Sequence, residues 1–520
     1  MGRARAVTEP WILAVDLGTG GLKTGAVSLR GEILAHAIAP IHTRYLPDGG
    51  AVQDPAEWWA CITDGVRFLM ESKAIRPDDL AGVGITGQWG STVPVGADGH
   101  PVGDCLLWSD TRGGPFAAKA MGGPIALFGY SPGNLLRWIQ ITGGAPSPHG
   151  ADPLGHELYL RNCEPDVYAK TTTLLEPLDY LGLRFTGRAA ATPASMILSW
   201  LTDNRPGAKP AYVSALVQRA GRDAGRLPAL IATGSVLGHV ASEVGEALGI
   251  PSVPVVCGVP DLHTAFIGSG AVAPYDAHIT ISTSSWIACE VPFKRTDVIH
   301  QMATVPGLRP GAYLVANNHE TAGLALTWFR DAVIGSDSYQ QLVARAAHVP
   351  AGSGGVMFTP WLNGERSPVE DRNLRGAFLN VSLTTGRDHL TRALLEGVAF
   401  NARWLLDAVE GFIHRPIASL RILGGGAESE LWCQIHADIL GRRLERVAAP
   451  TYANLRGAAL FAAISLGRIS LEDVRGAVMV TDTFEPVAQT SSTYAPMYAE
   501  FKQFYGRLHG SYARLNGRKN

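Results

Sequence analysis

The segment WILAVDLGTGGLKTGAVSL, residues 11–29, constrains the fold more than any other part of the chain. It predicts two apolar strands joined by a turn that carries most of its glycine residues and both of its charged side chains. Glycine amides that no side chain shields can face an anion such as phosphate. Asp16 would repel phosphate directly, so its carboxylate makes sense mainly with a magnesium ion between the two. Lys23 would then add a matching positive charge.

A second segment, HITISTSSWIACEV at residues 278–291, partly repeats this pattern. It is again rich in β-forming residues and has small hydroxyl side chains in its middle. Two phosphate-type hairpins in two halves of one chain suggest a duplicated nucleotide clamp. The simpler alternative for the first hairpin is a surface turn with a solvated aspartate and lysine.

The length of the chain limits how many cores it can form. Its 520 residues suit two domains of about 200 to 250 residues each. Hydrophobic residues make up 46% and charged residues only 17%, which is typical of a globular protein, and the net charge of −2 gives no general attraction to nucleic acid or membranes. No run approaches the ~18 apolar residues of a membrane span. The six scattered cysteines indicate neither a disulfide framework nor a zinc site, so we expect a cytoplasmic protein.

Cap and turn residues place further elements along the chain. Asp54 followed by Pro55 predicts the start of a helix that runs to about residue 71. Residues 114–223 predict a long all-helical insertion, in which Leu174, Leu175, Leu178 and Leu181 have helical spacing. A long amphipathic core helix is expected at residues 388–410.

Asp261 is the candidate catalytic carboxylate. It follows an expected strand at residues 253–258 and precedes a stretch of small residues, which places it at the mouth of the predicted sheet. An ordinary helix N-cap is the alternative. Its position just before the second hairpin puts it near the expected junction of the two domains.

Three consecutive glycines, Gly424 to Gly426, stand between an expected strand and an expected helix. They would let a flat or anionic ligand approach the backbone, and the helix N-terminus would add its positive end. Close packing of the helix on the sheet explains the same glycines without a ligand.

With these elements in order, the chain resembles the FGGY family of carbohydrate kinases, and within it most closely the xylulokinases. The resemblance covers roughly residues 11–467, and its segments are VDLGTGGLK, DPAEWW, GITGQ, LLWSDTR, GVPD, PWLNGERSP, LLEGVAF and LGGGAESELW followed by DILGRRLE. It implies an α/β fold of two ribonuclease-H-like domains, of the actin, sugar kinase and Hsp70 ATPase type, with ATP and sugar in a cleft between them.

The resemblance also implies domain boundaries and an activity. We expect an N-terminal kinase domain over residues 1–271, a C-terminal kinase domain over residues 272–475 and an appendage over residues 476–520. The expected reaction is ATP-dependent phosphorylation of a sugar hydroxyl, with D-xylulose converted to D-xylulose 5-phosphate in carbohydrate catabolism. The partners would be the sugar and ATP, without nucleic acid or membrane, and a homodimer stays open.

Two alternatives remain for the function. One is a kinase for another ketose or polyol of the same family. The other is a catalytically weak nucleotide-binding regulatory protein of this fold. The presence of both Asp16 and Asp261 favours an enzyme, because a protein that only binds nucleotide has no need for the second acid.

The matched motifs imply roles for individual residues. Asp261 matches the general base that takes a proton from the sugar hydroxyl, and Asp16 matches an acid that holds magnesium. The implied ATP contacts form three groups: a first phosphate loop (Thr19, Gly20, Lys23), a second phosphate loop with a nearby glycine (Thr283, Ser284, Gly323) and an adenine end (Gly426, Ala427, Glu430). The implied sugar contacts are Gln88, Trp89, Gly90, Trp108 and Asp261, with Trp286 as a further apolar face.

Some residues depart from the family pattern. Ser282 and Ser285 stand where the second phosphate loop usually has glycine, so its backbone or its approach to phosphate is expected to differ. Asn380 also replaces a usual glycine. Trp89 and Gly90 replace the Met-His of xylulokinases and the Arg-Glu pair of glycerol kinases, which predicts that glycerol is a poor substrate and that Gly90 leaves room for an extra carbon. Packing of Trp89 in the core is the alternative.

Overall fold

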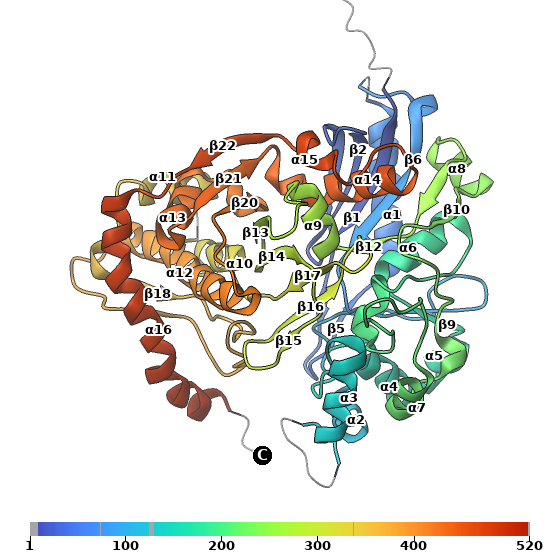
Figure 1. Cartoon of the computed structure of the whole chain (residues 1–520), viewed down its shortest axis with the longest axis horizontal. Coiled ribbons are helices and arrows are strands. Elements are labelled where there is room, and N and C mark those ends of the chain that lie inside the picture. Colours follow the sequence, from blue (N-terminus) through green and yellow to red (C-terminus); the bar gives the residue numbers. More distant parts are fainter. Residues whose placement is uncertain (1–8, 73, 124–128, 336, 518–520) are drawn as a thin grey trace, which may run out of the picture. The chain divides into compact units, whose positions relative to one another are not determined.

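The computed structural model describes residues 9–72, 74–123, 129–335 and 337–517, which form two compact units. The first unit comprises Met1–Gly268, Val305–Tyr313 and Asn454–Ala477, and the second comprises Ser269–Thr304, Leu314–Ala453 and Val478–Asn520. Both units combine a mixed β-sheet with helices, which confirms the α/β class (Figure 1). Each unit gathers separate stretches of chain, and the predicted domain boundaries stay predictions.

The first unit holds most of the short strands. Its strands are β1 (Trp11–Leu17), β2 (Gly21–Ser28), β3 (Ile33–Pro40), β4 (Arg44–Tyr45), β5 (Ala51–Gln53), β6 (Leu80–Gly87), β7 (Val93–Val95), β8 (Cys105–Leu106), β9 (Thr173–Leu175), β10 (Val236–His239), β11 (Pro254–Val256) and β12 (Val259–Pro260). The helices that lie mainly in this unit are α1 (Pro55–Met70), α2 (Gly114–Met121), α3 (Pro132–Thr142), α4 (Pro153–Cys163), α5 (Pro165–Lys170), α6 (Pro177–Thr186), α7 (Ser214–Ala220), α8 (Ser242–Leu248), α9 (Asp261–Ser269), α14 (Ala453–Ser465) and α15 (Val474–Ala477).

The central sheet of the first unit has the strand order β10-β11-β6-β1-β2-β3, and β12 also pairs with β6. β1 is antiparallel to β2 and parallel to β6. A side chain on Gly25 of β2 would clash with Leu455 of α14, whereas one on Gly65 of α1 would clash with Thr24 of β2. Neighbouring residues of a strand point to opposite faces, so α14 and α1 cover opposite faces of this sheet. Every residue of β1 is therefore buried.

The predicted helical insertion is largely present in the first unit. Its helices pack around an apolar cluster that includes Trp138, Leu158 and Leu216. The helical spacing of the leucines was misleading for the first two, because residues 174 and 175 lie in strand β9, which pairs with β7. Helix α6 begins only at Pro177, since proline suits the first helical position and has no N–H for the preceding ladder.

The second unit has fewer but longer helices. Its strands are β13 (Ala277–Ile281), β14 (Ser285–Val291), β15 (Thr296–Asp297), β16 (Met302–Pro306), β17 (Tyr313–Ala316), β18 (Met357–Thr359), β19 (Ala377–Leu379), β20 (Ser419–Leu423), β21 (Arg443–Val447) and β22 (Val480–Phe484), some of which reach the boundary with the first unit. Its helices are α10 (Gly323–Trp328), α11 (Tyr339–Ala346), α12 (Arg387–Ile413), α13 (Glu430–Leu440) and α16 (Ala488–Asn516).

The central sheet of the second unit repeats the plan of the first. Its strand order is β15-β16-β17-β14-β13-β20-β21-β22. β13 is antiparallel to β14 and parallel to β20, just as β1 is antiparallel to β2 and parallel to β6. The second hairpin predicted from residues 278–291 is therefore confirmed.

The segment predicted as a C-terminal appendage packs into the second unit as α16. Tyr494 and Phe501 are fully buried, and the ring of Phe501 lies 5.6 Å from that of Trp361 between centroids. The hydroxyl of Tyr494 donates to Glu396 at 2.7 Å and accepts from Arg392 at 2.8 Å. Aromatic burial of this kind makes α16 part of the core of the second unit.

The six cysteines are all free thiols. Four of them, at positions 105, 257, 289 and 433, are buried. Within the described ranges, no helix combines the length and the apolar character that crossing a membrane requires.

Candidate active site

Asp16 of β1 lies directly opposite Lys23 of β2. The Lys23 ammonium group is 2.9 Å from the Asp16 carboxylate, which is almost fully buried. The sequence predicted that the turn carries both charged side chains, but β1 extends to Leu17 and β2 begins at Gly21. Only residues 18–20 form the turn, so the lysine meets the carboxylate across the hairpin rather than within the loop.

The carboxyl ends of β1, β6 and β12 lie beside one another. Thr86 of β6 is in register with Asp16 on one side and with Val259 on the other. Its hydroxyl donates to the carbonyl of Val259 at 2.8 Å and lies 2.9 Å from the hydroxyl of Thr264 in α9. Asp261 begins α9 directly after β12. Asp16 and Asp261 therefore occupy the sheet edge at which open α/β sheets bind ligands.

The Asp261 carboxyl group has a pKa raised to about 7. Loss of solvation is the larger cause, and the negative charge of Asp16 is the second. The backbone N–H of Leu262 donates to Asp261 at 2.8 Å and opposes this rise. A carboxyl group that titrates near neutral pH suits a general base.

Gln88, Thr19 and Trp108 form one hydrogen-bonded group. The Thr19 hydroxyl donates to the side-chain oxygen of Gln88 at 3.2 Å and accepts from the indole N–H of Trp108 at 3.2 Å. The amide group of Gln88 donates to Gln53 at 3.0 Å. The fold thus brings a residue predicted for phosphate, Thr19, against two residues predicted for sugar.

Trp89 and Gly90 follow in the turn after β6. The indole N–H of Trp89 donates to the carbonyl of Ser195 at 2.9 Å, and its ring meets that of His263 edge-on at 6.4 Å. Gly90 has a φ of +81°, and a Cβ atom there would lie 2.9 Å from Leu198. Glycine therefore serves the backbone turn. The Leu198 side chain thus borders Gly90, and the room that Gly90 leaves for an extra sugar carbon stays a prediction.

The second unit joins β13 to β14 through residues 282–284. The N–H of Gly323 donates to the carbonyl of Ser282 at 2.7 Å, and the N–H of Leu324 donates to that of Thr283 at 3.2 Å. The start of α10 is thereby held against the turn. Thr283, Ser284 and Gly323, which were predicted to contact phosphate, lie together in this arrangement.

The glycines after β20 are explained in part by packing. Gly424 has a φ of +91°, and a Cβ atom there would clash with the carbonyl of Ile281 at the end of β13. A Cβ atom on Gly426 would clash with the Ile281 side chain, whereas one on Gly425 would meet nothing within 4 Å. Close contact with β13 thus accounts for Gly424 and Gly426, as the packing alternative required.

Three further predicted residues lie in the second unit. Ala427 is buried in the turn that follows β20. Glu430 begins α13 with a mostly exposed side chain, 3.8 Å from the guanidinium group of Arg446. Trp286 lies on β14, and its buried indole N–H has no hydrogen-bond partner among the described residues.

Two models of one protein family match the chain. The N-terminal domain of the FGGY family of carbohydrate kinases matches residues 11–121, and the C-terminal domain of the same family matches residues 283–466. The chain belongs to the FGGY family of carbohydrate kinases.

Relatives of this FGGY kinase match it over nearly its whole length. The xylulose kinase of Staphylococcus epidermidis is 26% identical over 500 residues, which are 95% of this chain and 96% of that protein. The gluconokinase of Bacillus licheniformis is 23% identical over 525 residues, 97% of each chain. The solved xylulose kinase from Rhodospirillum rubrum has a TM-score of 0.80 at 26% identity and covers 96% of this chain and 99% of its own.

These comparisons confirm the fold and the enzyme class. The chain has the ribonuclease-H-like fold of the actin, sugar kinase and Hsp70 type in two sheet-containing units. It is a sugar kinase, a phosphotransferase whose family uses ATP. The roles of individual site residues stay predictions.

The departures from the FGGY pattern have a simple backbone explanation. Ser282 and Ser285 are not among the described residues with a positive φ, so serine meets no conformational penalty at either place. Asn380 has a φ of +60°, and its side-chain amide donates to the carbonyl of Gly355 at 3.0 Å. Asparagine tolerates this left-handed conformation better than most residues, so it reproduces the backbone that glycine would adopt.

Sequence reasoning missed two residues of this FGGY kinase that support the predicted site. Gln53 of β5 is fully buried and donates to the carbonyl of Thr19 at 2.7 Å. Glu176 accepts from the backbone N–H groups of Gly90 and Ser91, both at 3.1 Å. A charged residue inside the apolar run LLEPLDYL was the available signal for Glu176. No comparable signal marks Gln53.

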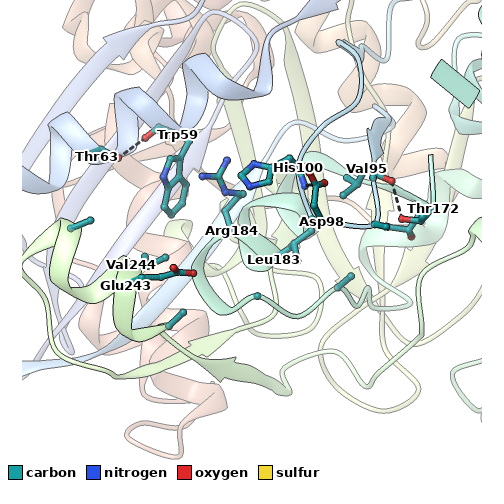
Figure 2. A pocket seen from close by; sticks show the side chains of 18 of the residues that line it. Trp59, Thr63, Val95, Asp98, His100, Thr172, Leu183, Arg184, Glu243 and Val244 are labelled. Carbon is teal, nitrogen blue, oxygen red and sulfur yellow. Dashed lines mark hydrogen bonds between the residues drawn. The ribbon is translucent and has the colours of Figure 1, made fainter. Parts of the chain in front are cut away.

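A cavity of about 640 Å³ lies elsewhere in the first unit of the kinase (Figure 2). Its walls come from α1, the turn after β7, α6 and α8, and Arg184 lies over the ring of Trp59 at 4.7 Å. None of the residues predicted to bind sugar, ATP or magnesium lines it. This cavity therefore does not mark the predicted site.

The Asp16 carboxylate of the kinase fits a nucleotide-bound magnesium ion. No group of three or more His, Cys, Asp or Glu residues that could hold a metal occurs in the described ranges. Magnesium needs only one or two protein carboxylates when phosphate oxygens and water complete its octahedral shell. Asp16 supplies a hard oxygen donor at the sheet edge, which is the kind of donor that such an ion requires.

Proposed function

We propose that this kinase transfers the γ-phosphoryl group of ATP to a hydroxyl group of D-xylulose, with D-xylulose 5-phosphate as the product. The observation that carries the proposal is the Asp261 carboxyl group, which lies at the carboxyl edge of the sheet with its pKa raised to about 7 by burial and by Asp16. The xylulose kinase of Staphylococcus epidermidis, similar over nearly the whole chain, supports the choice of sugar.

In the proposed reaction, Asp261 in its carboxylate form accepts the proton of the sugar hydroxyl. The hydroxyl oxygen forms a bond to the γ-phosphorus atom while the bond from that phosphorus to the bridging oxygen of ADP breaks. The proton ends on Asp261, and ADP leaves with the electron pair of the broken bond. Magnesium held by Asp16 would neutralise charge on the phosphate groups.

The other predicted site residues of the first unit would orient the sugar and ATP. Gln88 and Trp108 share the Thr19 hydroxyl, so a sugar bound by these side chains would lie next to the first phosphate loop. Lys23, held by Asp16, would place its positive charge beside the same loop. Phosphoryl transfer depends mostly on such positioning and on charge stabilisation.

Substrate preference is the test of this proposal. The positions where glycerol kinases carry an Arg-Glu pair are Trp89 and Gly90, so glycerol would lose its buried hydrogen-bond partners. We expect xylulose, or a similar five-carbon ketose or polyol, to exceed glycerol by at least ~100-fold in kcat/KM. An ADP-release assay across ketoses, aldoses and polyols measures this ratio. Comparable values for glycerol would reduce the assignment to a sugar or polyol kinase.

The same assay tests the two alternative functions, a kinase for another sugar-like substrate and a regulatory protein of this fold. Gluconate belongs in the panel because the gluconokinase of Bacillus licheniformis is similar over the whole chain. A higher kcat/KM for gluconate than for every ketose would replace xylulose as the substrate. ATP binding without turnover of any sugar would instead favour a regulatory protein of this fold.

A further inference from the structure

Glu176 is a buried carboxyl group that the proposed reaction does not use. It immediately precedes α6, and only 2% of the residue is exposed. One carboxylate oxygen, Oε2, accepts from the N–H groups of Gly90 and Ser91 at 3.1 Å each. The other oxygen, Oε1, is buried without a hydrogen-bond partner among the described residues.

The environment of Glu176 makes its carboxyl group costly to bury. No lysine or arginine of the described chain forms an ion pair with it. Loss of solvation, followed by the charge of Asp179, raises the pKa of Glu176 well above its ordinary value. The two backbone N–H donors and the charge of Arg222 offset this rise only in part, so an apolar residue would serve better at this position if packing were the only demand.

The turn that Glu176 holds is the one that carries the predicted sugar residues. At its beginning, the N–H of Gln88 donates to the carbonyl of Leu17 at 2.7 Å. At its end, the hydroxyl of Ser91 accepts from the backbone N–H of Trp108 at 3.1 Å. Glu176 therefore fixes the middle of this turn, between Trp89 and the contact to Trp108.

We propose that Glu176 is a positioning residue that sets the sugar preference of this kinase by holding the turn at residues 88–91. The inference rests on the proposed function, because the sugar role of that turn belongs to it. Removal of the acceptor would leave two buried N–H groups unpaired, and the turn would move to satisfy them. A displacement of about 1 Å in a positioning group can cost ~100-fold in rate.

Three variants separate positioning from general stability. Glu176→Leu removes the acceptor at similar volume, and Glu176→Gln keeps an oxygen that can accept both N–H groups. Leu181→Ala is the matched control, because Leu181 is fully buried on the same helix and offers the turn no hydrogen bond. It destabilises the helix packing without touching the acceptor.

The kinetic readout is the KM for sugar against the KM for ATP. We expect Glu176→Leu to raise the KM for sugar by at least ~10-fold and to leave the KM for ATP within about threefold. Glu176→Gln should keep the KM for sugar within about threefold of the wild-type value. Leu181→Ala should lower Tm and leave the KM for sugar unchanged. Equal changes in both KM values, or a sugar KM that Glu176→Leu leaves unchanged, would overturn the proposal.

Amide hydrogen exchange tests the turn without relying on turnover. Glu176→Leu should speed exchange in peptides that cover residues 88–91 by at least ~10-fold relative to Leu181→Ala, because two protected N–H groups lose their acceptor. Unchanged exchange would show that Glu176 does not hold the turn. If the wild-type protein phosphorylates no sugar, the proposed function fails and the sugar-preference claim falls with it, whereas faster exchange would still assign the turn to Glu176.

Discussion

Asp16 and Asp261 show how two carboxyl groups of the same residue type obtain different properties from their surroundings. Asp16 forms an ion pair of 2.9 Å with Lys23. Asp261 forms no ion pair with a lysine or arginine of the described chain, and its pKa rises to about 7. A buried carboxyl group of this kind, whose charged form is disfavoured, can exchange a proton near neutral pH. This property of Asp261 supports its proposed role as the general base, whereas the ion pair with Lys23 places Asp16 beside the first phosphate loop, where we propose that it holds magnesium.

The first residue-level prediction concerns the base itself. Asp261→Asn removes the proton acceptor and keeps the shape of the side chain. We expect turnover to fall by at least ~100-fold, the usual contribution of general base catalysis. ATP binding measured by calorimetry should stay within a few-fold of the wild-type value, which serves as the control for folding. Turnover close to that of the wild type would remove Asp261 from the mechanism.

The raised pKa of Asp261 predicts a pH dependence of activity. Below about pH 7 the carboxyl group holds a proton and cannot accept another, so kcat/KM for the sugar should fall as the pH decreases. The loss should approach about tenfold per pH unit, as for a single titrating group. A pH profile from about pH 5.5 to about pH 8.5 checks this expectation. A flat profile across that range would contradict it.

The pH dependence of stability should be opposite to that of activity: ionisation of Asp261 at rising pH should lower the free energy of unfolding. The folded protein keeps the Asp261 proton up to about pH 7, whereas an unfolded chain releases it near the ordinary value of 3.8. The contribution of Asp261 to the free energy of unfolding is therefore full below pH 3.8 and is lost as the pH rises to about 7. Asp261→Asn should gain Tm relative to the wild type at about pH 8 and less at about pH 5. An equal Tm difference at both pH values would argue against a raised pKa.

Among the secondary-structure elements, the glycine run that joins β20 to the following helix shows that adjacent glycines can have different steric surroundings. Gly424 combines a left-handed φ of +91° with close contact to the carbonyl of Ile281. Gly425, its neighbour, has open space around the Cβ position. The same residue type thus meets a steric demand at one position and none at the next.

This difference predicts unequal effects of alanine at the two positions. Gly424→Ala must move the end of β13 or the turn, at a cost of about 1–3 kcal/mol. We expect its Tm to fall by at least ~3 °C, whereas Gly425→Ala should stay within about 1 °C of the wild type. Thermal unfolding of both variants gives the comparison. Equal losses of Tm would show that the helix start, and not the contact with Ile281, controls stability here.

At the scale of the whole molecule, the predicted site residues divide between the two units. Asp16, Gln88, Trp108 and Asp261 belong to the first unit, whereas Thr283, Gly323 and the adenine-end residues belong to the second. Each unit contributes a hairpin of the same topology, β1–β2 in one and β13–β14 in the other. The repeat of a single structural plan accounts for the two phosphate-type hairpins in the sequence.

This division of the site residues predicts which segments each substrate should protect from amide hydrogen exchange. Xylulose without nucleotide should slow amide exchange at residues 86–91 in the first unit and leave residues 282–284 and 424–428 in the second unit unchanged. ATP with magnesium should slow exchange at those second-unit segments. Mass spectrometry of exchanged peptides measures both effects. Absence of sugar protection at residues 86–91 would remove Gln88 and Trp89 from the sugar contacts.

Local chemistry made much of this protein predictable from its sequence. Asp54 caps α1 by accepting from the N–H of Ala56 at 2.8 Å, and Pro55 begins the helix as expected. The two hairpins and the family of the chain were also predicted correctly, and the helix predicted at residues 388–410 is present at residues 387–413. Caps, turns and motifs depend on residues near one another in the chain, so their signals survive without any knowledge of the fold.

Contacts between distant segments could be seen only in the three-dimensional structure. It placed residues 174 and 175 in a strand beside β7 and the Leu198 side chain next to Gly90. It also brought Glu176 to the turn of Gly90, 86 residues away in the chain. Such contacts follow from packing between elements and leave no periodic pattern in either segment. The hairpins, the caps and the family thus follow from signals that lie close together in the chain, whereas long-range packing sets how the turn that carries the predicted sugar residues is held.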